Sequence, residues 1–129
     1  MTAHWTRHPV IAGVIGLFAG ALTIALVEWA AGQWLGPGDV TQPGTIPPAK
    51  FAAVLVAWVL GAGTAALVGT AWCGGRTPLP GLIAAGVLLA GSVATMFAIP
   101  HPTWMVLGAV VLMPAAAWLG ARSRRVVAG

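Results

Sequence analysis

The sequence predicts an all-α protein, a four-helix transmembrane bundle that forms a single domain over residues 1–129. Of the 129 residues, 59% are hydrophobic and only 6% are charged, whereas an average soluble domain is about 25% charged. The apolar residues also fall into four long runs, and about 20 apolar residues in a helix cross the hydrocarbon core of a bilayer. A soluble fold could not cover its surface with so few charges, so the lipid bilayer is the expected partner.

The four spans are expected at about residues 9–35, 51–72, 79–99 and 103–121. The first contains 18 uncharged residues from Val10 to Val27. Short turns join the second span to the third and the third to the fourth, which predicts antiparallel neighbours. Residues 36–50 contain four prolines and are expected to form an irregular outer loop.

Charge and tryptophan placement predict the orientation. Arg7, Arg76 and three arginines near the end of the chain share one side of a four-span topology, and Lys50 lies on the other. The positive-inside rule then places both termini in the cytoplasm, in a multi-pass protein of the bacterial inner (cytoplasmic) membrane. Six of the seven tryptophans fall into two belts at the expected interfaces, Trp5, Trp72 and Trp118 on one side and Trp29, Trp34 and Trp104 on the other.

Trp58 is the seventh tryptophan and lies near the middle of the second span. Packing against other helices or contact with lipid is the favoured interpretation of this ring. Lining a binding site is the alternative.

Glu28 is the strongest candidate for a functional residue, because an ionisable group inside a membrane span suggests a functional site by default. The alternative is a glutamate at the outer interface beside Trp29. His101 stands between two prolines, which would hold a titratable ring rigidly, as a ligand site or proton relay needs. The turn could equally contain a histidine by accident. The candidate polar site, all expected on the outer side, is Glu28, His101, Trp104, Lys50 and Asp39.

Neither a metal nor a cofactor is expected. One histidine and two scattered carboxylates at this site are too few and too generic for metal binding. The single cysteine, Cys73, offers no metal-binding pair and no internal disulfide.

Small residues predict helix packing. Gly13, Gly16 and Gly20 lie close to one face of the first span, and Gly61 belongs to a looser set in the second. The spacing of Gly16 and Gly20 lets two membrane helices approach closely. The partner could be another helix of the same chain or a second copy of it.

No enzyme is expected, because no nucleophile, base and oxyanion donor can be placed together. Nucleic acid is not expected as a partner, since the basic residues flank apolar runs instead of forming a patch with exposed aromatics. The favoured function is a non-catalytic membrane module or accessory subunit, in a homo-oligomer or a larger membrane complex. The alternative is a small proton- or cation-coupled transporter or channel that uses an outer site at Glu28 and His101.

Several short motifs carry a resemblance: Val27-Glu28 at the end of the first span, Ala57-Trp58 with Gly61, and Pro114-Ala115-Ala116. With the Pro100-His101-Pro102-Thr103-Trp104 turn, they resemble an uncharacterised family of small bacterial four-span inner-membrane proteins, for which this PHPxW turn is the most specific feature. The resemblance covers most of the chain and implies architecture and location, not activity. In size and span count the chain is also similar to small multidrug resistance transporters. Their glutamate lies in mid-helix, however, so their mechanism is not carried over.

Overall fold

A computed structural model describes residues 8–36 and 41–125. Within these ranges the chain forms α1 (Pro9–Leu35), the short 3-10 helix η2 (Pro43–Thr45), α2 (Pro48–Trp72), α3 (Leu79–Ala98) and α4 (Thr103–Arg124), without a strand. All four α-helices are long and apolar enough to cross a membrane. The all-α, four-helix prediction is therefore confirmed for the described residues, and the chain is a multi-pass membrane protein.

Three helix boundaries differ from the prediction. α2 begins at Pro48, three residues early, so the expected loop over residues 36–50 ends at Pro47 and also contains η2. Proline suits the first turn of a helix, where its missing N–H costs no hydrogen bond. α4 continues past Ala121 to Arg124, since cationic side chains in a last turn favour the helix. α3 ends at Ala98, one residue early.

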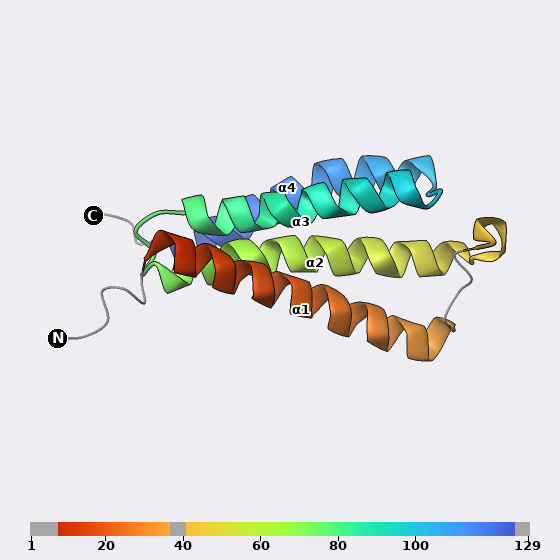
Figure 1. The fold of residues 1–129 in the computed structure, drawn as a ribbon, viewed down its shortest axis with the longest axis horizontal. Helices are drawn as coiled ribbons and strands as arrows, with labels where there is room; N and C mark the ends of the chain where they lie inside the picture. The colour runs from red at the N-terminus through yellow and green to blue at the C-terminus, as the bar shows by residue number, and fades with distance from the viewer. Residues whose placement is uncertain (1–7, 37–40, 126–129) are drawn as a thin grey trace.

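α2 is the central helix of the bundle and contacts α1, α3 and α4 (Figure 1). Its buried positions are mainly alanine and glycine, which allow neighbouring backbones to approach closely. Met105 and Met113 of α4 are the largest side chains that are almost fully covered among the described residues, whereas the larger Phe51 and Trp58 of α2 are buried but retain a little exposure.

Glycines bring α1, α2 and α3 into backbone contact. A Cβ added at Gly16 would lie 2.6 Å from the carbonyl oxygen of Ala65, and one at Gly20 would lie 2.7 Å from that of Gly61. A Cβ at Gly69 would lie 2.6 Å from Gly81 Cα. We call Gly16, Gly20, Gly61, Gly69 and Gly81 the glycine seam. The predicted packing face of the first span is thus used inside the monomer.

α1 diverges from α3 along its length. At its start, Gly13 faces Pro80, where a Cβ would make an ordinary 3.5 Å contact, and Gly20 faces the side chain of Leu88. Towards Leu35, α1 moves away from α2 and α3 (Figure 1). We call this the loop end of the bundle, because it holds η2 and the turn between α3 and α4. The opposite end, where α1 begins and α4 ends, is the terminal end.

Candidate functional site

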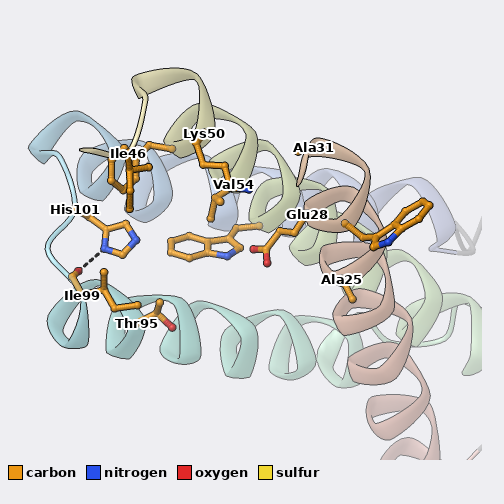
Figure 2. A pocket seen from close by; sticks show the side chains of 12 residues that line it. Ala25, Glu28, Ala31, Ile46, Lys50, Val54, Thr95, Ile99 and His101 are labelled. Atoms are coloured by element: carbon orange, nitrogen blue, oxygen red, sulfur yellow. Dashed lines mark hydrogen bonds between the residues drawn. The ribbon is translucent and has the colours of Figure 1, made fainter. Parts of the chain in front are cut away.

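The divergence of α1 leaves a cavity of about 580 Å³ at the loop end. α1, α2, α3 and the two connections at this end supply its walls, and Figure 2 shows the side chains that line it. Its volume lies within the range of roughly 300–1,000 Å³ that is usual for small-molecule sites. The lining residues are Ala25, Glu28, Trp29, Ala31, Ile46, Lys50, Phe51, Val54, Trp58, Thr95, Ile99 and His101.

The structure brings three of the five candidate polar residues together. Glu28, Lys50 and His101 come from α1, α2 and the α3–α4 turn, and all line the cavity. Trp104 does not line it; its side chain is 47% exposed on α4. Asp39 lies outside the described residues.

Lys50 joins the start of α2 to the end of α1. Its Nζ donates a 2.7 Å hydrogen bond to the carbonyl oxygen of Gly36, one of the last carbonyls of α1, which have no partner within the helix. Nζ also lies 3.8 Å from the position that a Cβ on Gly32 would take. Gly32 follows Glu28 by one helical turn, so Lys50 sits one turn from Glu28 along the same face of α1. Its positive charge acts on the Glu28 carboxyl.

Glu28 is half-buried and faces other helices. Its carboxyl group interacts with the side chain of Trp58. An indole N–H can only donate a hydrogen bond, so in this pair the Glu28 carboxyl oxygen is the acceptor. Glu28 precedes the end of α1 by seven residues, or about 10 Å at the rise of an α-helix. Glu28 therefore lies within α1 and not at its end, whatever the depth of the bilayer interface beside Trp29.

Trp58 is packed among the helices, as one of the two favoured interpretations expected, and it also lines the cavity. Its side chain is only 5% exposed, so it does not face lipid, and it lines the cavity between Glu28 and His101. Its ring centroid lies 5.9 Å from that of His101. A signal was available: Phe51, Val54 and Trp58 are spaced to share one face of a helix, and an indole N–H inside a span needs an acceptor.

His101 presents one ring nitrogen to the cavity. Its Nδ1 is hydrogen-bonded to the carbonyl oxygen of Ile99, and because a carbonyl only accepts, geometry assigns the proton to Nδ1. Nε2 takes no part in that bond, and Figure 2 shows this second nitrogen directed into the cavity, where it can accept a hydrogen bond. Phe51 supports the ring in an edge-on contact, with a centroid distance of 5.5 Å.

The glycine seam borders the cavity on the side of the terminal end. Gly20 is five residues before Ala25, and Gly61 is three residues after Trp58. At these glycines α1 and α2 are in backbone contact. The seam therefore closes the α1–α2 side of the cavity towards the terminal end.

The chain has no match among protein-family models, curated proteins or solved structures. Over residues 8–36 and 41–125, no three His, Cys, Asp or Glu side chains gather where a metal ion could bind. The arrangement at the loop end consists of two hydrogen-bond acceptors, Glu28 and Nε2 of His101, on either side of the Trp58 ring, with Lys50 one turn away. Such a site can hold a ligand that donates hydrogen bonds.

Proposed function

We propose that this protein is a non-catalytic membrane module that binds a small, hydrogen-bond-donating or cationic ligand in the cavity at the loop end. The module lies in the bacterial inner membrane with both termini in the cytoplasm and the loop end outside. It acts as a binding subunit of a homo-oligomer or of a larger membrane complex. The observation that carries this proposal is a carboxyl group inside a span that faces a cavity rather than a packed interface.

The energetic cost of Glu28 supports a role for it. Insertion scales put an acid at the centre of a membrane helix at about 2.5–3.5 kcal/mol, and less towards the interface. The Trp58 N–H beside Glu28 can supply one hydrogen bond, whereas a carboxylate can accept several. The remaining acceptor capacity faces the cavity, where a cationic ligand would find it together with Nε2 of His101.

Binding of ethylammonium to the detergent-solubilised protein tests the proposal. Titration followed by saturation-transfer NMR should give saturable binding that Glu28→Gln weakens at least tenfold. Glutamine keeps the shape and can still accept from Trp58, so the fold should survive. Gln33→Ala, on the exposed surface of α1 and away from the cavity, is the matched control. Equal binding by wild type and Glu28→Gln would refute the proposal.

A small cation-coupled transporter is the second candidate, favoured by the closure of the cavity on one side at the glycine seam. Transport would require the seam to separate and the loop end to close. The assay is ethylammonium uptake into proteoliposomes. Uptake that Glu28→Gln abolishes supports a transporter, and binding without uptake supports the module.

A further inference from the structure

The cavity opens sideways between α1 and α3. Ala25 of α1 and Thr95 of α3 stand on its two side walls, and both are exposed. Trp58 and Phe51 of α2 are buried and form its back. The helices run along the long axis of the molecule (Figure 1), which lies along the normal of a membrane that they cross. An opening between two neighbouring helices therefore faces the lipid chains.

The rim of this opening is apolar and aromatic. Trp29 lines the cavity with its side chain 66% exposed, and Ile99 lines it from the turn that follows α3. Tryptophan prefers the region where lipid head groups meet acyl chains. The surroundings thus suit a molecule with a polar head inside the cavity and an apolar part outside it.

The cavity also contains one acidic and one basic side chain, Glu28 and Lys50, and each keeps hydrogen-bonding capacity that the other does not use. Lys50 uses a donor on Gly36, and an ammonium group has three donors. Glu28 lies one helical turn away, or about 6 Å. Thr95 donates its hydroxyl proton to Gly91, so it offers the cavity only acceptor capacity. Acceptors at Glu28 and His101 beside donors at Lys50 match a ligand that carries an ammonium and an anion on a short linker.

We infer that the occupant is a phospholipid whose zwitterionic head group contains a primary ammonium, and that it reaches the cavity laterally between α1 and α3. The ammonium binds Glu28, the phosphate binds the free donors of Lys50, and the acyl chains stay outside between α1 and α3. A trimethylated ammonium has no N–H to donate, so a choline head group should bind less well. This inference rests on the proposed function and names the ligand of the same site.

Lipid retention after reconstitution tests the inference. The protein is placed in nanodiscs with equal amounts of phosphatidylethanolamine, phosphatidylcholine and phosphatidylglycerol, and the lipids that remain bound are counted by native mass spectrometry. We expect at least fivefold enrichment of phosphatidylethanolamine over phosphatidylcholine. Glu28→Gln should abolish that enrichment. Ala25→Phe, which fills the opening, should do the same, whereas Ala30→Phe on the exposed surface of α1 should retain it.

A second pair of variants and a soluble probe keep the outcomes distinct. Thr95→Phe narrows the opening from α3, with Ala94→Phe beside it as the control, so a failure of Ala25→Phe to fold does not stop the test. Phosphoethanolamine without acyl chains should bind the wild type in detergent and lose binding in Glu28→Gln.

If phosphoethanolamine binds in a Glu28-dependent way but phosphatidylethanolamine is not enriched, the lipid inference is wrong and the proposed function stands. Enrichment that persists in Glu28→Gln or in both opening-filling variants also overturns the inference. If no probe depends on Glu28, both proposals fall.

Discussion

Replacement of Gly69 by alanine should lower the free energy of unfolding by about 1–3 kcal/mol, the usual cost of overpacking a well-packed core. The added Cβ would lie 2.6 Å from Gly81 Cα, 2.9 Å from Gly81 N and 3.4 Å from the carbonyl oxygen of Ala12, whereas ordinary contact begins at 3.4 Å. The two closest atoms belong to the backbone of α3, so no side chain can rotate away. α2 and α3 must instead move apart and lose contacts along the seam.

Gly63→Ala is the matched control within the same helix. Its Cβ would meet nothing closer than the carbonyl oxygen of Ala116 at 3.5 Å. Alanine is favoured over glycine in a helix interior by about 0.8–1 kcal/mol, so this variant should be unchanged or slightly more stable. The two substitutions add the same atoms to the same helix and differ only in the space that receives them.

The assay is equilibrium unfolding in mixed micelles, in which rising dodecyl sulfate displaces a mild detergent and helix content is followed by circular dichroism. Gly69→Ala should unfold at a lower dodecyl sulfate fraction than wild type, and Gly63→Ala at the same or a higher fraction. A shift of equal sign and size in both variants would refute the packing argument.

Three further substitutions probe the site and the core. Trp58→Phe keeps an aromatic ring but removes the N–H donor beside Glu28, so the same unfolding assay should show a loss of about 1–3 kcal/mol; no change would mean that no hydrogen bond from this N–H to Glu28 stabilises the fold. Lys50→Met removes the bond to the Gly36 carbonyl oxygen, worth about 1 kcal/mol, and by loosening the end of α1 should speed exchange of the Gly36 amide hydrogen, which bonds to Gly32, several-fold; unaltered exchange would show that Lys50 does not hold this end of the helix. Met113→Ala empties a core position with 1% exposure and should cost about 2–5 kcal/mol, while the exposed Leu112→Ala should cost much less, and equal costs would show that Met113 is not core.

The four helices were predictable because each apolar run is long enough to cross a bilayer. Two spans separate Glu28 from His101 along the chain, so both residues were expected at the same end of the bundle. Which side of each helix faces the other helices was less predictable. A helix that is apolar on all sides has no polar stripe to mark its outer face, so nothing in the hydropathy of α2 placed Trp58 inward. The glycines carried partial information, since Gly16 and Gly20 do make the close contacts that their spacing suggests.

The contacts across the loop end escaped prediction for a different reason. The bond from Lys50 to Gly36 joins residues 14 positions apart and depends on how the intervening segment folds back, which local pattern does not specify. The divergence of α1, which creates the cavity, likewise depends on where the glycine contacts stop.

α1 is attached to α2 at two places, and the first of them can act as the pivot for a tilt of the helix. Its glycines hold it against α2 at the terminal end, and Lys50 holds it at the far end through Gly36. From Gly20 to Leu35 the segment between these attachments is 15 residues long, or about 22 Å, so a tilt of about 5° at the pivot would displace its tip by roughly 2 Å. Release of the Lys50 bond would therefore leave only the seam to set the tilt of α1, and a tilt of this size would change the width of the opening by ångströms without any rearrangement of the seam.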